Sequence, residues 1–146
     1  MITNDFELII LTDKTPSEVF PTLLDVRSWW SGFYNETFEG NSEQPGDEFT
    51  FSAGDGAHYT KQKMTELVPN KKVSWLVTEA NLSFVEDTKE WIGTEISFEV
   101  ERENDKTKIT FTHKGLIPDF ECYSACSTAW HGYINNRLLK ILKYEN

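Results

Sequence analysis

The last third of the chain constrains the fold most, because it places one long helix directly after a strand. Residues 108–113 alternate as a strand does, and residues 120–144 carry apolar residues at helical spacing. A helix of that length is the one predicted element long enough to cover a sheet. Its first half is aromatic, small and partly polar, whereas its second half is aliphatic. This difference predicts a helix whose first half covers a cavity and whose second half packs into the core.

The preceding residues predict an antiparallel sheet. Strand patterns, rich in β-branched and aromatic residues, occur at residues 6–12, 35–39, 47–53, 57–67, 73–78, 91–102 and 107–113. Thr15, Pro16 and Glu18 predict the start of a short helix after the first strand, and Pro21 predicts that this helix bends or ends early. A second short helix is expected after Asp25. We therefore predict an α+β fold in which a curved antiparallel sheet of about six to seven strands wraps around the C-terminal helix.

Two strands show which side chains should face the interior. The inward face is predicted to carry Ile92, Thr94, Ile96, Phe98 and Val100 of one strand, and Ile109, Phe111 and His113 of the last strand. Residues 81–89 are polar and acidic, and they are predicted to form a longer hairpin connection.

Size and charge exclude several classes of function. A chain of 146 residues suits one domain, 1–146, that buries a core. The net charge of −10 disfavours binding to nucleic acid or to an anionic membrane. The sequence has neither an apolar stretch of membrane-spanning length nor a recognisable leader peptide, so we expect no membrane insertion and a cytoplasmic location. The two cysteines are expected to be free thiols.

The order and spacing of several short segments resemble the START-like, helix-grip superfamily, also called SRPBCC. The matching segments are residues 16–20, 29–30, 46–49, 65–69 with 73–75, 91–98, and 110–116 with 121–123 and Trp130. Within that superfamily the chain is similar to the branch of activators of the heat-shock chaperone ATPase. The resemblance covers nearly the whole chain and implies a hydrophobic cavity between the sheet and the long helix. It implies no single reaction, because members bind lipids, hormones or polyketides, or serve chaperones.

Aromatic and aliphatic candidates for ligand contact come from the second short helix and the strands. Trp29 and Trp30 could form a wall or gate of the cavity, or pack beneath the edge of the sheet. Trp75, Ile96 and Phe111 lie on inward strand faces, where they could line a cavity or fill a core.

Polar candidates lie near the end of the sheet and on the helix. Thr94 and His113 would place polar atoms inside an apolar row. Thr94 could contact a ligand or satisfy a backbone group, and His113 could contact a ligand or simply be a buried histidine with a hydrogen-bond partner. Tyr123 and Trp130 offer hydrogen-bonding tips, and Cys126 offers a small apolar wall.

No motif indicates a cofactor or a metal. The chain lacks a phosphate loop, a dinucleotide fingerprint and a nucleophile elbow, and its Cys-x-x-x-Cys spacing is not that of a zinc site. We therefore expect a protein that binds a small, largely hydrophobic molecule. The alternatives are an enzyme of the cyclase or dehydratase kind, with His113 and Tyr123 as acid–base candidates, and a module that binds a protein partner or forms a homodimer.

Overall fold

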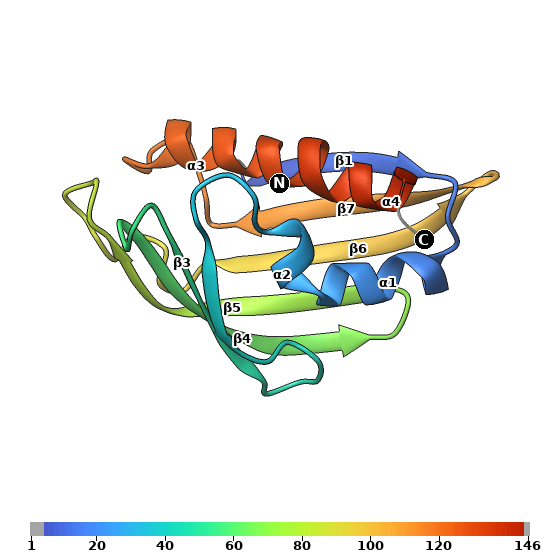
Figure 1. The fold of residues 1–146 in the computed structure, drawn as a ribbon, viewed down its shortest axis with the longest axis horizontal. Coiled ribbons are helices and arrows are strands. Elements are labelled where there is room, and N and C mark those ends of the chain that lie inside the picture. Colours follow the sequence, from blue (N-terminus) through green and yellow to red (C-terminus); the bar gives the residue numbers. More distant parts are fainter. Residues whose placement is uncertain (1–4, 145–146) are drawn as a thin grey trace.

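Seven antiparallel strands form one curved sheet in the computed structural model, which describes residues 5–144 (Figure 1). The strand order is β1-β7-β6-β5-β4-β3-β2, so the first strand lies at one edge beside the last. The bounds are β1 Phe6–Thr12, β2 Thr37–Gly40, β3 Glu48–Ala53, β4 His58–Val68, β5 Lys72–Leu82, β6 Glu95–Glu103 and β7 Lys106–Lys114. The predicted α+β fold is confirmed.

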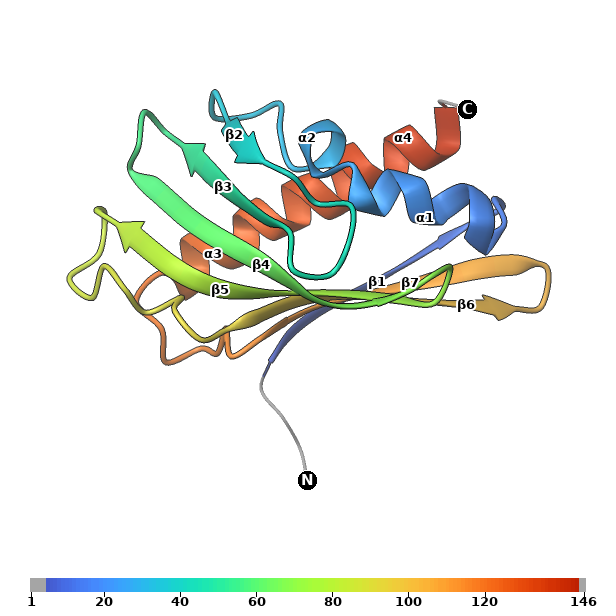
Figure 2. The ribbon, with the colours of Figure 1, turned by 90° about the horizontal axis from the view of Figure 1, so that it is seen from below.

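The described helices lie on one face of the sheet (Figure 2). The longest stretch runs from α3 Tyr123–His131 through the π-helical segment η1 Gly132–Leu138 into α4 Leu139–Tyr144. The sheet curves around it, and β4 has register shifts against β5 between Lys61 and Gln62 and between Met64 and Glu66. Such irregularities bend a strand and increase its twist, which lets the sheet wrap around the helix.

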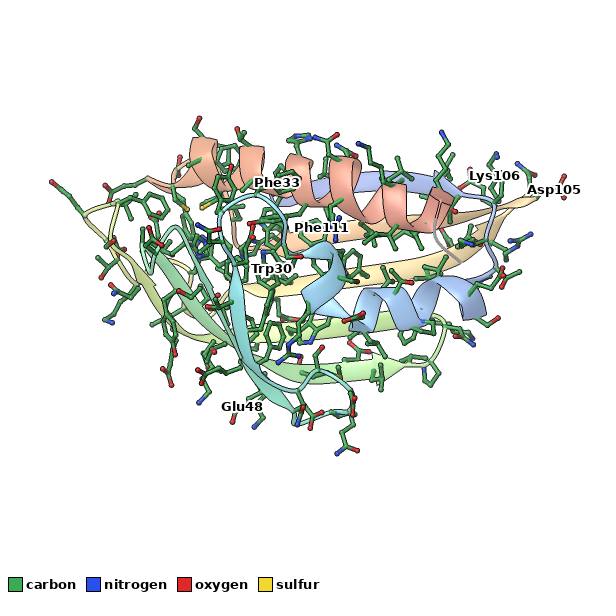
Figure 3. All side chains as sticks on the ribbon, viewed as in Figure 1. Trp30, Phe33, Glu48, Asp105, Lys106 and Phe111 are labelled. Carbon is green, nitrogen blue, oxygen red and sulfur yellow. The ribbon has the colours of Figure 1, made fainter. Side chains whose placement is uncertain are left out.

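The interior is rich in aromatic rings. Trp30 and Phe111 point into the space between the layers, whereas Glu48, Asp105 and Lys106 point into solvent (Figure 3). Within residues 5–144, no helix combines the length and the apolarity that crossing a membrane requires.

The two short helices follow β1 as predicted. α1 Pro16–Leu24 begins with a capping box, in which Thr15 and Glu18 each bind the other's backbone N–H. α1 is short, as predicted, at nine residues, but Pro21 lies inside it and the helix continues to Leu24. α2 Val26–Trp29 is a single turn that buries Trp29 and is followed by Trp30 as its C-cap residue.

The strand predicted over residues 91–102 begins later than its alternating pattern suggests. β6 starts at Glu95, and residues 91–94 form a turn in which the Thr94 N–H donates to the Trp91 carbonyl at 3.0 Å. Gly93 makes this turn possible, because its φ of +89° belongs to the left-handed region that glycine tolerates. Ile92 is consequently 44% exposed, and its predicted inward orientation is wrong.

Two further boundaries differ from the sequence prediction. β5 extends to Leu82, so the connection predicted at residues 81–89 begins one or two residues later. The C-terminal helix was expected from residue 120, but residues 117–122 form turns and α3 starts at Tyr123. The Glu90 carboxylate accepts the N–H of Cys122 at 2.9 Å, and this hydrogen bond caps the helix from outside its own segment.

Candidate functional site

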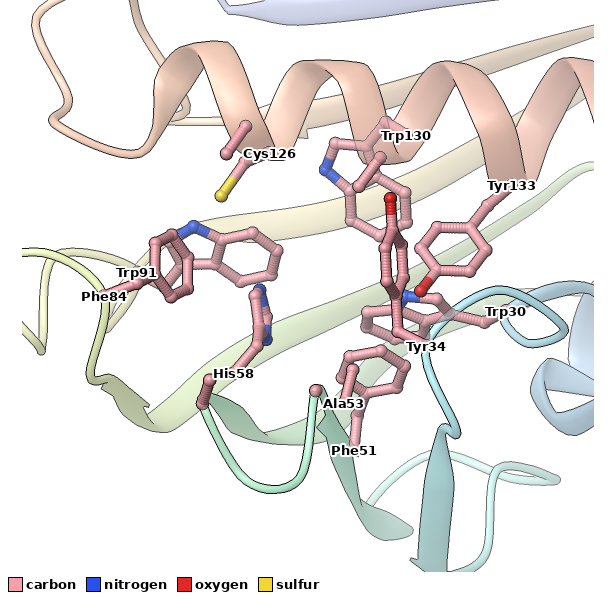
Figure 4. Close-up of a pocket in the computed structure, with 14 residues that line it drawn as sticks. Trp30, Tyr34, Phe51, Ala53, His58, Phe84, Trp91, Cys126, Trp130 and Tyr133 are labelled. Atoms are coloured by element: carbon pink, nitrogen blue, oxygen red, sulfur yellow. The ribbon is translucent and has the colours of Figure 1, made fainter.

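A cavity of about 240 Å³ lies between the aromatic half of the C-terminal helix and the near end of the sheet (Figure 4). It is lined by Trp30, Tyr34, Phe51, Ala53, Gly54, Ala57, His58, Phe84, Trp91, Ala125, Cys126, Ala129, Trp130 and Tyr133. The small residues come from α3 and from the β3–β4 turn, and the space they leave is bounded by the large rings. Neither a lysine, an arginine nor a carboxylate belongs to this lining.

The aromatic rings of the lining contact one another as a continuous wall. Trp30 stacks on Phe51 with ring centroids 4.3 Å apart, and it lies 5.1 Å from Trp130. Trp130 in turn stacks at 6.0 Å with Trp91. Centroid distances of this size are those of favourable aromatic pairs. The wall therefore offers flat, apolar surfaces from the loop after α2, from β3 and from α3.

A chain of buried hydrogen bonds holds two of these tryptophans from behind. The indole Nε1–H of Trp130 donates to Nδ1 of His113 at 3.1 Å. The proton of the neutral imidazole therefore lies on Nε2, which donates to Thr94 Oγ1 at 2.8 Å. Thr94 Oγ1 donates to the carbonyl oxygen of Trp91 at 2.6 Å. Burial lowers the pKa of His113 to about 3, so this imidazole is neutral near neutral pH.

His58 differs from His113, because it lies in the cavity lining itself. Its ring stands on edge against Trp91 at 4.7 Å and against Phe51 at 5.5 Å. The buried Nδ1 atom of His58 has no hydrogen-bond partner among the described residues. Desolvation by burial lowers the pKa of His58 to about 4, against a smaller opposing effect of its own backbone. This imidazole is thus neutral near neutral pH and has hydrogen-bonding capacity that the protein does not use.

A carboxylate fixes the loop that carries Tyr34 over the cavity. Glu36 accepts the backbone N–H groups of Gly32, Phe33 and Tyr34 at 2.9–3.3 Å, and it accepts the hydroxyl of Tyr133 at 2.6 Å. Burial opposes ionisation of Glu36, but these hydrogen bonds outweigh it and hold its pKa below the usual value. Burial, together with the bond to Glu36, raises the pKa of Tyr133. The loop and the helix are therefore joined at the mouth of the cavity.

The two cysteines are free and buried. The indole Nε1–H of Trp91 donates to Cys122 Sγ at 3.2 Å, which orients this ring from a second direction. The hydrogen bond to Cys122, followed by burial, raises the pKa of Cys126, so the thiol in the cavity wall is protonated. Across residues 5–144, no three His, Cys, Asp or Glu side chains come together as metal ligands.

Of the ten predicted ligand contacts, the structure brings three into the cavity lining, and these are Trp30, Cys126 and Trp130. Seven lie outside the lining. His113 and Thr94 support the wall from behind, and the buried core holds Trp29, Trp75, Ile96 and Phe111. Tyr123 is half-buried, and its ring packs 6.4 Å from that of Phe6.

Several lining residues were missed from the sequence. His58 is the first residue of β4, and Phe84 and Trp91 lie in turns, where nothing in the local pattern indicates a shared site. Phe51 alternates with polar residues in β3, and that signal could have placed it on the inner face. Tyr34 sits in an irregular loop, and tertiary contacts bring it over the cavity: the bond between Glu36 and Tyr133, and the hydrogen bond from the Gly54 N–H to the Tyr34 carbonyl at 2.9 Å.

The curved sheet, the two helices after β1 and the long C-terminal helix define a START-like, helix-grip protein. A family model described as "Activator of Hsp90 ATPase homolog 1-like protein" matches residues 13–143. The chain therefore belongs to this family, as the resemblance in the sequence predicted. No curated protein matches the sequence.

Solved structures share the fold at low sequence identity. The solution structure of the Aha1 dimer from Colwellia psychrerythraea is 23% identical with a TM-score of 0.73, covering 97% of this chain and 98% of that chain. Protein MLL2253 from Mesorhizobium loti is 15% identical with a TM-score of 0.73, covering 97% and 99%. DynU16, from the dynemicin biosynthetic locus, is 13% identical with a TM-score of 0.64, covering 97% of this chain and 48% of that chain. These similarities establish the fold.

Proposed function

We propose that the protein binds a small, largely hydrophobic molecule in the cavity between the C-terminal helix and the sheet. The observation that carries this proposal is a space of about 240 Å³ whose lining is almost entirely aromatic or small and apolar. Concave, mostly apolar sites with few polar groups are typical of small-molecule binding. Affinity would come from burying the ligand's apolar surface, at about 25 cal/mol per Å² before the costs of ordering are subtracted.

The anchoring of the wall supports this proposal. A core without a ligand would gain contacts by letting its rings collapse into the empty space. Here the rings are tied elsewhere, because Trp130 donates to His113, Trp91 donates to Cys122, and Tyr133 donates to Glu36. Each of these hydrogen bonds would be strained or lost on collapse. These three hydrogen bonds therefore favour an arrangement of the rings that keeps the space open.

Among the predicted contacts, we propose that Trp30, Cys126 and Trp130 touch the ligand directly, while Thr94 and His113 act through Trp91 and Trp130. The cyclase or dehydratase alternative has less support. Both ring nitrogens of His113 already have partners, and this side chain lies outside the lining. Tyr123, the other acid–base candidate, packs against Phe6 instead.

We further infer that the chain acts as one START-like binding unit in the cytoplasm. The two buried thiols suit a reducing compartment.

The alternative partner is a protein or a second copy of the chain. The exposed rings of Phe33, Tyr34 and Phe84 near the cavity would be available for such a contact. Light scattering coupled to size-exclusion chromatography measures self-association directly.

The test combines native mass spectrometry of the purified protein with thermal unfolding in the presence of naphthalene. A ligand at ten times its Kd should add about 1.4 kcal/mol of stability, which corresponds to a rise in Tm of about 4 °C. Ala129→Leu fills part of the cavity and should reduce this rise. The matched control is Thr128→Leu, on the exposed side of the same helix, which should retain it. An unchanged Tm in the wild-type protein for every apolar compound, with no copurified molecule, contradicts the proposal.

A further inference from the structure

The polar groups around the cavity are unequally used, and this points to the class of ligand. Trp91, Trp130 and Tyr133 each present a donor near the cavity, but all three are engaged with Cys122, His113 and Glu36. His58 is the one lining residue with a fully buried side-chain nitrogen or oxygen that has no partner among the described residues. An unsatisfied buried group of this kind costs free energy unless a ligand or water completes it.

Figure 4 shows where this imidazole lies relative to the space. His58 extends from the start of β4 toward the helix, between Trp91 and Phe51. The ring of Phe84 stacks on the imidazole with centroids 6.1 Å apart and an interplanar angle of 24°, so a third ring packs against His58. A polar atom in this setting is fixed by packing, so it can orient a ligand without first being ordered.

The charge of the site selects against ions. Neither a lysine nor an arginine lines the cavity, so a buried anion would have no permanent countercharge there. His58 cannot supply one near neutral pH, because burial lowers its pKa to about 4. The net charge of −10 further disfavours anionic molecules. Burying an unpaired charge is far more costly than burying a neutral polar group.

The size and shape of the space favour a flat molecule. A cavity of about 150 Å³ holds one benzene ring, and the space here measures about 240 Å³. The walls are ring faces and edges, which stack on aromatic ligands at centroid distances of roughly 4.5–7 Å. A single hydroxyl group suits Nδ1 of His58 in either tautomer, because a hydroxyl can both donate and accept.

We propose that the cavity selects a neutral, flat aromatic molecule of about two fused rings that carries one hydroxyl group, and that this hydroxyl forms a hydrogen bond with Nδ1 of His58. This inference rests on the proposed binding function and narrows it to a ligand class. It assigns recognition of the polar group to His58 and recognition of the rings to the tryptophan wall.

The test measures the Kd of three matched compounds by isothermal titration calorimetry near neutral pH. These are 2-naphthol, 2-methylnaphthalene, which has nearly the same shape without the hydroxyl, and 2-naphthoate, which is anionic. The wild-type protein should bind 2-naphthol about fivefold to tenfold more tightly than 2-methylnaphthalene, because one net hydrogen bond is worth about that factor. 2-Naphthoate should bind at least about tenfold more weakly than 2-naphthol.

His58→Phe keeps an aromatic ring but removes the nitrogen, so it should bind both neutral compounds with nearly equal Kd. His58→Gln, which restores a polar side chain, should recover part of the preference and serves as the second variant if the first does not fold. In the wild-type protein, the NMR chemical shift of His58 Nδ1 should respond to 2-naphthol far more than to 2-methylnaphthalene.

The possible failures are distinguishable. If 2-methylnaphthalene binds as tightly as 2-naphthol, or if His58→Phe keeps the preference, the inference about His58 is wrong while the cavity function stands. Tightest binding of 2-naphthoate also overturns it. If none of the three compounds binds, this inference fails, and the proposed function fails with it only if the other apolar compounds also leave the Tm unchanged and no molecule copurifies.

Discussion

Lowering the pH from about 7 to about 5 is expected to destabilise the protein through two histidines, the buried His113 and the half-buried His58. His113 can accept a second proton only at Nδ1, which already receives the indole N–H of Trp130. Protonation would break that bond and leave a charge among the rings of Trp91 and Trp130. Burial accordingly lowers the pKa of His113 to about 3 and that of His58 to about 4, from 6.5 in an unfolded chain.

The magnitude follows from proton linkage. Between the folded and unfolded pKa values, the unfolded chain binds more protons than the folded chain. The stability that the two neutral histidines contribute is therefore fully present above about pH 6.5, and it is lost progressively as the pH falls below that value. Each histidine contributes a slope of about 1.4 kcal/mol per pH unit within this window. Between about pH 7 and about pH 5 the loss is about 2 kcal/mol for each histidine, or about 4 kcal/mol for both.

Urea unfolding at several pH values, followed by tryptophan fluorescence, measures this loss. His113→Gln cannot titrate, although its amide can still accept from Trp130 and donate to Thr94. We expect the acid-induced loss in this variant to fall to about half of the wild-type value. His131→Gln removes an exposed imidazole at the end of α3 and serves as the control. The same loss in the wild-type protein and in His113→Gln would refute the reasoning.

Three further predictions concern the supports of the site. Thr94→Val should cost about 1–3 kcal/mol in urea unfolding, because it leaves the buried N–H of His113 without an acceptor, and Thr94→Ser should cost less; equal losses contradict this. Glu36→Gln should increase amide hydrogen exchange at residues 32–34 by about tenfold, because a charged acceptor of three N–H groups becomes neutral; unchanged exchange contradicts it. Gly115→Ala should lower the Tm by several degrees, because φ is +98° and the new Cβ would lie 2.9 Å from Thr94 Cγ2; an unchanged Tm contradicts it.

The order of elements was predictable because each rests on local patterns. The capping box of Thr15 and Glu18, the alternation in Phe111 and His113, and the length of the C-terminal helix are all visible in short windows of sequence. Boundaries were less predictable. The alternation in the sequence predicted a strand from Trp91. The left-handed backbone at Gly93 instead places residues 91–94 in a turn, so the strand begins at Glu95.

The site was harder to predict than the fold, because its residues meet only through tertiary structure. Trp30, Cys126 and Trp130 could be proposed from aromatic and helical spacing alone. His58 and Trp91 could not, because they are 33 positions apart in sequence and are brought together by the ends of β4 and the turn before β6. The parity rule that placed His113 inside was right, but it could not distinguish a residue behind the wall from a residue in the lining.

The π-helical segment from Gly132 to Leu138 separates the long helix into two parts with different phase. In this segment the N–H of Leu139 bonds to the carbonyl of Ile134, five positions earlier, so one extra residue is accommodated in the turn. An extra residue rotates everything beyond it by about 100° relative to an uninterrupted α-helix. Substitutions in α3 before Gly132 can therefore alter the wall of the cavity, while Leu138 and Leu142 keep the orientation that anchors the helix in the core.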